Sequence, residues 1–595
     1  MTTVALAGHR PRPLVSWRVR KLVVGYSYLV PAALCMLATV VVPIGMAIKM
    51  SLYHDVLYKP QDYRFIGLGN YVRLVQDPVF WLTLWNSVVW VFGSVLLQFL
   101  AGFAAALLLQ QAFRGRALVR TLTLLPWIIP GVVVGLIWEW LYQPNYGVIN
   151  DLLLKAGWMH DRVAWLSSAD LAMPAVIFTN IWRGIPFFAI MLLAGLQAIP
   201  GELYEAAHVD GAGVLGRFWH ITLPLLRPII VVATATRIIW TFNYADLIFV
   251  MTAGGPANAT QITSTYTLLQ AYSSLDFGYA GALSVVLLLV MLAFTWLYLR
   301  TTRPRGYGMT RRAAPKDLAE RLLSGPMVWI GLALLTAFAL GPFIWMFLTS
   351  LKDRQELYAT PLQYLPVHPT FENYIDAWTS PVTPFSRFFL NSLWVCSVTM
   401  VATTVVSVLA GYAIARFRFA GRDALLLIFL APQMFPSVLL IAPLLTQWRA
   451  LGLIDTYQAL IYSNFSFTVP FTVWMMVGYF SSIPRDLEES AMIDGCNHFG
   501  ALCRIVLPLA APGIAATAIF AFVVSWSELL FAISFTTETS MRTLSAGLLY
   551  MVGQYEVQWG QLSAGVILST VPVAVLFSFL QRHLIHGLTA RAVKG

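Results

Sequence analysis

Twelve apolar stretches, separated by polar segments, run along this chain. Each is long enough to cross the hydrocarbon core of a membrane, about 30 Å, as a helix. A backbone that faces lipid must satisfy its own hydrogen bonds, so runs of this length predict helices rather than open strands. The sequence therefore predicts an all-α integral membrane protein with twelve transmembrane helices, at residues 24–48, 82–109, 119–142, 171–196, 229–252, 279–299, 325–349, 388–413, 423–447, 459–480, 511–534 and 563–581.

One polar segment occurs twice. The two copies, Ile199–Pro228 and Ile483–Pro512 (the repeat segments), align without a gap and have identical residues at thirteen positions. An internal repeat of this kind indicates two similar halves. Both halves start on the same side of the membrane, which is typical of a parallel repeat about an axis along the membrane normal. We therefore expect two pseudo-symmetric six-helix halves, residues 1–300 and 325–595, joined by a basic cytoplasmic linker at 301–324.

Composition and charge agree with this pattern. Hydrophobic residues make up 58% of the 595 residues and charged residues only 11%, whereas soluble domains have about 25% charged residues. With the N-terminus in the cytoplasm, 25 of the 38 Lys and Arg residues fall on cytoplasmic segments and 11 on outside segments. This bias predicts a multi-pass protein of a bacterial-type plasma (inner) membrane with both termini and both repeat segments in the cytoplasm. The +11 charge follows the topology, so it does not indicate a nucleic-acid partner.

The first repeat segment begins like a capped helix. Pro200 suits the first turn of a helix, and Glu202 and Glu205 favour its positive end. Gly211 can adopt the left-handed conformation that ends it. Such a helix, anchored to the membrane at both ends, can lay its apolar face into a groove of a soluble partner. An ordinary loop with capped helices is the alternative for a single copy.

These residues carry a family resemblance. The pattern Glu-Ala-Ala, three residues, Gly, nine residues, Ile-x-Leu-Pro resembles the cytoplasmic EAA motif of binding-protein-dependent ABC importer permeases. Stretches such as "NYADLIFVMTAGGP" and "AGYAIARFRFAGR" are similar to the first and second permeases of maltose-type carbohydrate importers, which here look like a fusion protein. The motif residues are Glu205, Ala206, Ala207 and Gly211 in the first copy and Glu489, Ser490, Ala491 and Gly495 in the second, where Ser490 departs from the pattern.

The resemblance implies a fold like that of type I ABC importers and three kinds of partner. Two ABC ATPase subunits, which bind the ATP and Mg, would dock on the repeat segments. An extracytoplasmic solute-binding protein would seat on the outside loops and deliver the substrate. Glu205 and Glu489 are the residues that this resemblance assigns to pairing with the ATPases.

No catalytic chemistry is expected on the chain itself. The sequence lacks a Gly-x-x-x-x-Gly-Lys-Ser/Thr phosphate loop, so it is not the ATPase. Its four cysteines fit no metal spacing and no disulfide framework. We therefore predict a transport subunit that is not an enzyme, with no catalytic residue, no metal site and no bound cofactor.

The fifth span of each half ends in aromatic, amide, hydroxyl and carboxylate groups, a mixture that suits a carbohydrate. Packing between helices or in an interfacial aromatic belt is the alternative. The candidates for the substrate pathway are Trp240, Phe242, Asn243, Tyr244 and Asp246 in the first half and Trp526, Ser527 and Glu528 in the second.

Arg183 and Arg237 lie within predicted spans, where an unpaired charge is costly. One interpretation is a structural ion pair with an acidic residue such as Glu139, Asp246 or Glu528. The other is contact with an anionic substrate such as a sugar phosphate or glycerol phosphate. Both arginines are therefore candidates for the substrate pathway.

These observations predict the permease subunit of an ATP-driven ABC importer for a neutral sugar, oligosaccharide or polyol. A permease for an anionic solute such as glycerol phosphate is one alternative. A twelve-span secondary carrier is another, although it has no use for two partner-docking segments.

Overall fold

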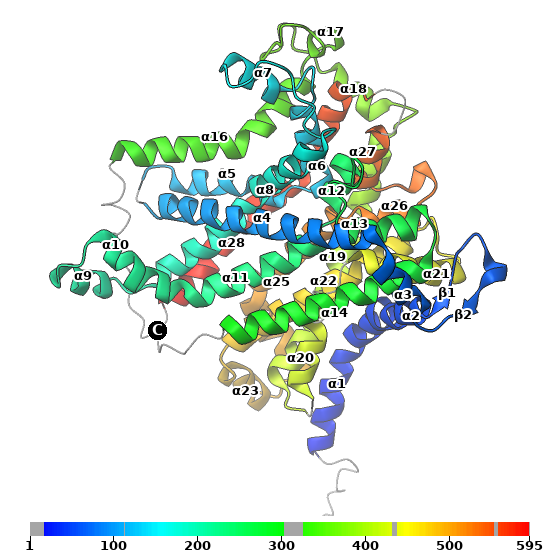
Figure 1. The fold of residues 1–595 in the computed structure, drawn as a ribbon. Helices are drawn as coiled ribbons and strands as arrows, with labels where there is room; N and C mark the ends of the chain where they lie inside the picture. The colour runs from blue at the N-terminus through cyan, green and yellow to red at the C-terminus, as the bar shows by residue number, and fades with distance from the viewer. Residues whose placement is uncertain are drawn as a thin grey trace, which may run out of the picture.

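The computed structural model describes residues 17–111, 113–302, 325–419, 421–430, 437–552 and 557–593, and within them the chain is a bundle of long helices (Figure 1). Ten described helices are long and apolar enough to cross a membrane, and a bent pair raises the number to eleven. The all-α transmembrane fold class is thereby confirmed. The remaining expected span, 423–447, includes residues 431–436, which lie outside the described residues, as do residues 303–324 of the expected linker.

The helices follow one another in the same order in both halves. The first half contains α1 (Trp17–Met36), η1 (Leu37–Val41), α2 (Val42–Ser51), α4 (Pro78–Gln110), α5 (Arg116–Ile128), α6 (Gly131–Leu141), α8 (Ala169–Ala198), α11 (Leu223–Asn243), α12 (Asp246–Thr252), α13 (Thr263–Leu268), η4 (Leu269–Ser273) and α14 (Phe277–Thr302). The second contains α16 (Gly325–Ser350), α19 (Phe385–Arg416), α20 (Arg422–Leu430), η6 (Ser437–Leu440), α21 (Ile441–Ala450), α22 (Tyr457–Ser482), α25 (Leu507–Trp526), α26 (Leu530–Phe535), α27 (Leu544–Val552) and α28 (Trp559–Val593).

Three expected spans are broken helices. The stretch 119–142 bends by 94° between α5 and α6, because Pro130 places Ile129 before it in extended backbone with ψ of 141°. The fifth span of each half also stops early: α11 gives way to the short α12, and α25 to the short α26. Hydropathy alone does not reveal these interruptions, since the apolar run continues through them.

The first span of each half packs against the opposite half. Helix α1 lies along α19 and α22, whereas α16 lies along α5 and α4 as well as α28. Tyr28 of α1 contacts the rings of Tyr412 and Phe417 at 5.9 Å and 6.2 Å. The two halves are therefore interlocked by exchanged helices and are not simply placed side by side.

One end of the bundle carries the short helices of the repeat segments, α9 (Glu202–Val209) and α23 (Asp486–Ile493), and the other end carries longer loops (Figure 1). At that opposite end the halves meet through Trp140 and Trp559, whose rings stack at 4.6 Å. Trp140 also donates its indole N–H to the hydroxyl of Thr349 at 3.2 Å. The loops there contain β1 (Tyr53–His54) paired antiparallel with β2 (Arg64–Phe65), η2 (Pro60–Asp62), α3 (Gly69–Gln76), α7 (Val148–Lys155), α17 (Arg354–Leu357), α18 (Glu372–Thr379) and η8 (Thr539–Met541).

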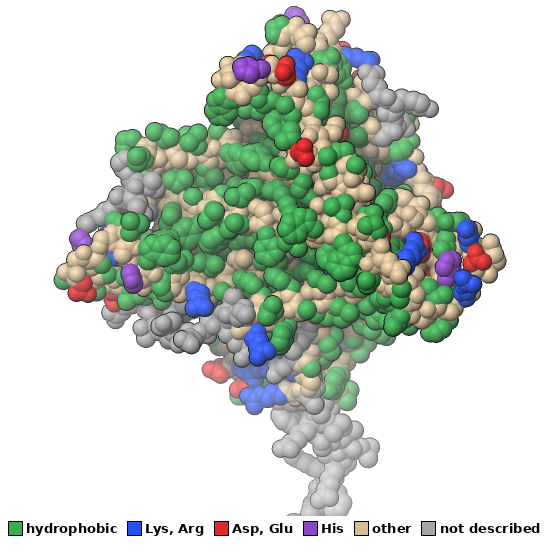
Figure 2. Space-filling model, viewed as in Figure 1, with side chains coloured by type: hydrophobic (Ala, Val, Ile, Leu, Met, Phe, Trp, Pro, Cys, Tyr) green, Lys and Arg blue, Asp and Glu red, His purple; other side chains and the backbone are tan. Residues whose placement is uncertain are grey.

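The surface agrees with a membrane location. Figure 2 shows hydrophobic side chains over most of the bundle, with Lys, Arg, Asp and Glu gathered toward its ends. Exposed residues along α4 include Trp85 at 64% and Leu96 at 59%. Apolar side chains left exposed along a whole helix are expected where lipid covers them.

Small residues set the closest helix contacts. Gly102 of α4 faces α8, where an added Cβ would lie 2.5 Å from the Cβ of Phe188. Gly411 of α19 faces α22, where an added Cβ would lie 2.6 Å from the Cβ of Met476. Close backbone approach at glycine is a main source of helix association in lipid, so each half uses the same device.

We predict that Gly102→Ala and Gly411→Ala each lower the free energy of unfolding by about 1–3 kcal/mol, because the new methyl group overpacks the contact. Thermal unfolding in detergent measures the effect. Gly45→Ala is the matched control, since no atom lies within 4 Å of the place that its new methyl group would take. Equal unfolding temperatures for the three variants would contradict this account of the packing.

Candidate functional site: repeat helices and an intramembrane polar cluster

The repeat segments have the same backbone in both halves. In each, a helix of eight residues ends at a left-handed glycine, with φ of +79° at Gly211 and +93° at Gly495. A four-residue helix and a π-helical turn follow and lead directly into the fifth span. Gly211, which was expected to end the first of these helices, does so, and Gly495 ends the second in the same way. The following elements are α10 (Val214–Arg217) and η3 (Phe218–Thr222) in the first half, and α24 (His498–Ala501) and η7 (Leu502–Val506) in the second.

Equivalent apolar residues of the two segments are exposed to nearly equal extents. Val209 is 87% exposed, and Ile493, its equivalent in the second copy, is 86% exposed. Leu203 and Leu487 are 43% and 45% exposed. The same holds for Leu215 and Phe499, at 69% and 56%. Apolar side chains exposed beyond the bundle at matched positions indicate a surface that a partner covers.

The motif residues lie around this apolar surface. Glu205 and Glu489 are exposed, as are Ala206 and Ser490, while Ala207 is half-buried. Ala491 is buried at 8% exposure. The exposed carboxylates sit in the first turn of α9 and α23, where the helix dipole favours negative charge. The two helices thus present similar acidic and apolar faces at separate places on the bundle (Figure 1).

A second cluster of polar groups lies within the spans of the first half. Arg237 of α11 is 4% exposed, and its Nε donates to Oε1 of Gln98 at 2.7 Å. The amide of Gln98 in turn donates to the carbonyl of Asn180 at 2.8 Å. Gln98 packs on Gly184, where a Cβ would lie 2.1 Å from its side-chain carbon. This chain of bonds joins α4, α8 and α11.

Arg183 lies over an aromatic ring. Its guanidinium is 4.4 Å from the ring centre of Tyr244, which follows the end of α11. The Tyr244 hydroxyl lies against Gly131 at the start of α6 and has no hydrogen-bond partner among the described residues. Asp246 interacts electrostatically with Arg183. Neither Arg183 nor Arg237 lies within 4 Å of a carboxylate in the described chain. Arg237 instead contacts the amide of Gln98, and Arg183 contacts the ring of Tyr244.

The remaining candidates divide into accessible and packed side chains. Trp240, Asn243, Asp246, Ser527 and Glu528 are half-buried. Phe242 is 9% exposed, and Trp526 is 1% exposed, with its indole N–H bonded to the carbonyl of Ser569 at 3.1 Å. The carboxylate of Glu528 accepts from the backbone N–H groups of Phe531 and Ala532, at 2.5 Å and 3.1 Å, and so caps α26. Among the candidates, Arg183 contacts Tyr244, and Asp246 interacts electrostatically with both Arg183 and Glu528 of the second half.

Sequence reasoning did not single out Gln98 and Asn180. Both are fully buried, and neither the side-chain nitrogen nor the side-chain oxygen of Asn180 has a hydrogen-bond partner among the residues described. An amide in the middle of an apolar span is the signal that could have found them. The described residues contain no group of three or more His, Cys, Asp or Glu that could hold a metal ion.

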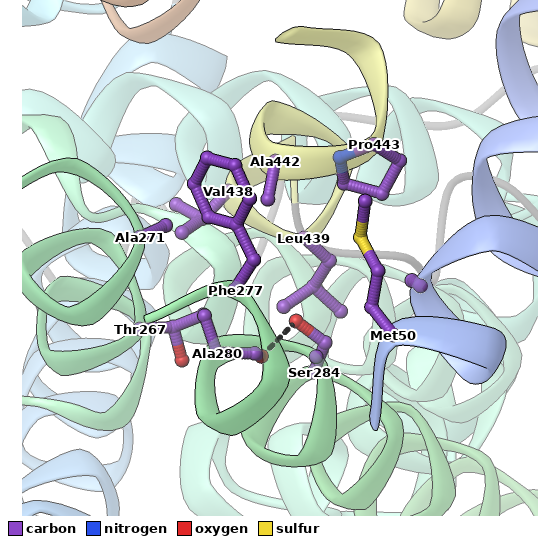
Figure 3. Close-up of a pocket in the computed structure, with 12 residues that line it drawn as sticks. Met50, Thr267, Ala271, Phe277, Ala280, Ser284, Val438, Leu439, Ala442 and Pro443 are labelled. Atoms are coloured by element: carbon purple, nitrogen blue, oxygen red, sulfur yellow. Dashed lines mark hydrogen bonds between the residues drawn. The ribbon is translucent and has the colours of Figure 1, made fainter. Parts of the chain in front are cut away.

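A small cavity elsewhere is apolar. It lies where α2 and α14 of the first half meet η6 and α21 of the second, and Met50, Phe277, Leu439 and Ala442 line it (Figure 3). Its two hydroxyl groups, those of Thr267 and Ser284, are bonded to the backbone carbonyls of Thr263 and Ala280 at 2.9 Å and 2.6 Å. This cavity is a packing gap between the halves and lacks the polar groups of the cluster around Arg183.

A family model describes both halves. The model of the binding-protein-dependent transport system inner membrane component matches residues 98–303 and again residues 404–589. The chain belongs to this family. It is a fused pair of such permease components, since the family domain occurs once in each half.

Two similar permease proteins agree with the duplication. A trehalose/maltose transport system permease protein of Thermococcus litoralis is 37% identical over 48% of this chain and 96% of its own length. A sulfoquinovosyl glycerol transport system permease protein of Agrobacterium fabrum is 38% identical over 48% of this chain and 100% of its own length. A chain of a solved bacterial alginate ABC transporter covers 48% of this chain, with a TM-score of 0.42 and 26% identity. The two permease relatives are about half as long as this chain.

We predict that Gln98→Leu lowers the free energy of unfolding by about 1.5–3 kcal/mol, because it leaves the buried guanidinium of Arg237 without its acceptor. Thermal unfolding of the purified chain measures this. The double variant Gln98→Leu/Arg237→Met should recover part of the loss, since both polar partners are then removed. Thr404→Val is a control, because its hydroxyl bonds only within its own helix, to Met400. A Gln98→Leu chain as stable as the control would contradict the role of this bond.

Proposed function

We propose that this chain is the permease subunit of an ATP-driven ABC importer for a sugar, oligosaccharide or polyol. The observation that carries the proposal is the pair of repeat helices with apolar residues exposed at equivalent positions, in a chain that contains the family domain twice. Two such surfaces fit two copies of a partner or two similar partners. The names of the similar permeases, for trehalose/maltose and sulfoquinovosyl glycerol, support a saccharide-like substrate.

The partners follow from the two ends of the bundle. Two ABC ATPase subunits, with ATP and Mg, dock on α9 and α23 at the cytoplasmic end, and the chain itself hydrolyses no ATP. An extracytoplasmic solute-binding protein seats on the opposite loops, where Trp158 and Leu365 are 80% and 67% exposed. Both termini then lie in the cytoplasm of a bacterial-type cell. Closure of the ATPase pair shifts the balance between inward- and outward-facing states, because the pair binds the two states with different affinity.

The substrate contacts a face formed mainly by the first half. Asn243 has a buried side-chain oxygen with no hydrogen-bond partner in the described chain, and so does the hydroxyl of Tyr244. Trp240 is half-buried beside Phe187, with ring centres 5.4 Å apart. Hydroxyl groups of a sugar can satisfy such groups, and an aromatic ring suits its CH face. A neutral sugar therefore needs no further charge at the site.

An anionic solute is the second candidate. Two guanidinium groups, Arg183 and Arg237, lie in the spans with no carboxylate within 4 Å among the described residues. One relative is named for sulfoquinovosyl glycerol. A screen of neutral and anionic saccharides against the solute-binding protein separates the two substrate classes. Uptake into proteoliposomes that depends on ATP and on the ATPase separates both from a secondary carrier, which is driven by a proton or sodium gradient alone.

We predict that the double variant Glu205→Ala/Glu489→Ala lowers ATP-driven uptake by about tenfold or more, because both docking helices lose the charge that pairs with the ATPases. Uptake into proteoliposomes containing the full complex measures this. Glu205→Asp/Glu489→Asp keeps an exposed carboxylate on each docking helix and is the control. A double variant that couples ATP hydrolysis to uptake at the full rate would falsify the assignment of these carboxylates.

We predict that Asn243→Ala raises the KM for uptake about 3- to 10-fold, the effect of losing one hydrogen bond to the substrate. ATP hydrolysis that is stimulated by the solute-binding protein should be retained. Ser527→Ala, at the equivalent position of the second half, reports the contribution of that half. An unchanged KM in Asn243→Ala would remove this residue from the substrate site.

A further inference from the structure

A buried ion pair joins the second repeat helix to the membrane-spanning part of its half. The Nε of Arg416 lies 2.5 Å from Oε1 of Glu488, and both side chains are 7% exposed. Arg416 is the last residue of α19, and Glu488 lies in the first turn of α23. Each charge therefore sits at the helix end that favours it, a cation at a C-terminus and an anion at an N-terminus.

Further hydrogen bonds surround the pair. Arg416 also donates to the carbonyl of Ile483, the residue that ends α22, at 3.0 Å. A second bond runs in the opposite direction: Arg485, which precedes α23, donates to the carbonyl of Ala415 at 3.0 Å. The hydroxyl of Tyr412 donates to the second oxygen of Glu488 at 3.1 Å. These bonds hold the ends of α19, α22 and α23 together through charged and backbone groups.

Aromatic rings cover this group. The ring of Phe417 lies 6.0 Å from that of Tyr412 and 5.1 Å from that of His498, which begins α24. Tyr28 of the exchanged helix α1 contacts both Tyr412 and Phe417. The rings exclude water from the pair, and an ion pair with little water around it is stronger than one on the surface.

The first half has no counterpart of this pair among its described residues. Tyr204 stands at the position equivalent to Glu488, and its hydroxyl bonds to Thr222 within the same repeat segment at 2.8 Å. At the end of α4, Gln110 and Gln111 take the place of Arg416. A side-chain oxygen of Gln110 and the side-chain nitrogen of Gln111 are buried without a hydrogen-bond partner in the described chain. Two other ion pairs among the described residues, Arg73–Asp276 and Asp151–Lys155, lie in or beside the loops of the opposite end.

Glu488 is distinct from the carboxylate that faces the partner. It is buried at 5% exposure, whereas its neighbour Glu489 is exposed. Helix α19 reaches the opposite end of the bundle, where Asn391 donates to the carbonyls of Ser540 and Arg542 at 2.8 Å and 2.9 Å. A displacement of α23 that is passed to α19 therefore extends to the loops at that end.

We propose that Arg416 and Glu488 are positioning residues that make α23 and α19 move as one body. The first repeat helix, α9, lacks such a link to α4. A displacement of α9 by its ATPase is therefore passed to α4 less directly. This inference rests on the proposed function, since it concerns how a displacement imposed by an ATPase on α23 reaches the spans. The two halves are then unequal in coupling although their repeat helices expose the same kind of surface.

The test compares Glu488→Gln with the parent chain in the complete complex with its ATPases and solute-binding protein, reconstituted in nanodiscs and in proteoliposomes. Removing the charge should lower the number of substrate molecules transported per ATP on the order of tenfold, the size of effect expected for coupling residues. The KM for ATP should stay unchanged, because Glu489 still faces the ATPase. Tyr204→Phe in the first half is the matched control and should leave the ratio within about twofold.

A distance measurement reports positioning directly. Spin labels are placed at the exposed positions Ile493 and Val401 of the second half, in a chain whose four cysteines are replaced, and at the corresponding positions Val209 and Leu96 of the first half. We expect a narrow distance distribution for 401–493 and a broader one for 96–209. Glu488→Gln should broaden only the 401–493 distribution.

Two results would overturn the proposal: an unchanged 401–493 distribution in Glu488→Gln, or transport per ATP equal to that of the parent. If Glu488→Gln does not assemble, Tyr412→Phe removes only one bond to Glu488, and the same broadening is required of it. If the parent complex shows no ATP-driven uptake, the proposed function fails. The distance measurement still decides whether the ion pair fixes α23 to α19.

Discussion

The structure depends on one constraint: the hydrocarbon core supplies no hydrogen bonds. Each span must satisfy its backbone internally, and an interruption is tolerated only where protein groups or water meet the freed polar atoms. The breaks between α5 and α6, α11 and α12, and α25 and α26 obey this constraint. At the third break the carboxylate of Glu528 accepts the first backbone N–H groups of α26. The broken helices and the polar side chains in the spans are thus parts of one arrangement.

The two halves satisfy this constraint with different polar groups in their interiors. In the first half, Arg237, Gln98 and Asn180 form a charged and amide network between α4, α8 and α11. In the second half, α19 and α22 are joined at comparable depth by hydroxyl pairs, Thr403–Thr468 at 3.0 Å and Ser407–Thr472 at 2.6 Å. A network that includes a buried guanidinium has more polar groups to satisfy than a pair of hydroxyls. Two halves with one helix order therefore differ in the buried polar groups that join their helices.

The halves are nevertheless mechanically connected. Exchange of α1 and α16 buries part of each half against the other, and the stacked pair Trp140–Trp559 closes the seam at the end opposite the repeat helices. The repeat helices lie apart from one another at the other end (Figure 1). A displacement of either repeat helix relative to the seam passes along the spans that continue from the repeat segments, α11 and α25, or along a span that is bonded to them, such as α19. Links such as Arg416–Glu488 then determine how much of the displacement is transmitted.

The sequence by itself determined the fold class, the duplication and the left-handed Gly211 of the first repeat helix, because hydropathy, an ungapped repeat and the special freedom of glycine are local properties of the chain. It also indicated the exposed faces of these helices, since Glu205 and Glu489 lie in short polar segments between apolar runs. Only the tertiary structure decided the partners of the buried charges. Arg237 meets Gln98, which is distant in the chain, and Arg416 meets Glu488 across two helix ends. The exchange of α1 and α16 could not be predicted from the sequence either. An apolar transmembrane helix carries no local signal of which half it will contact.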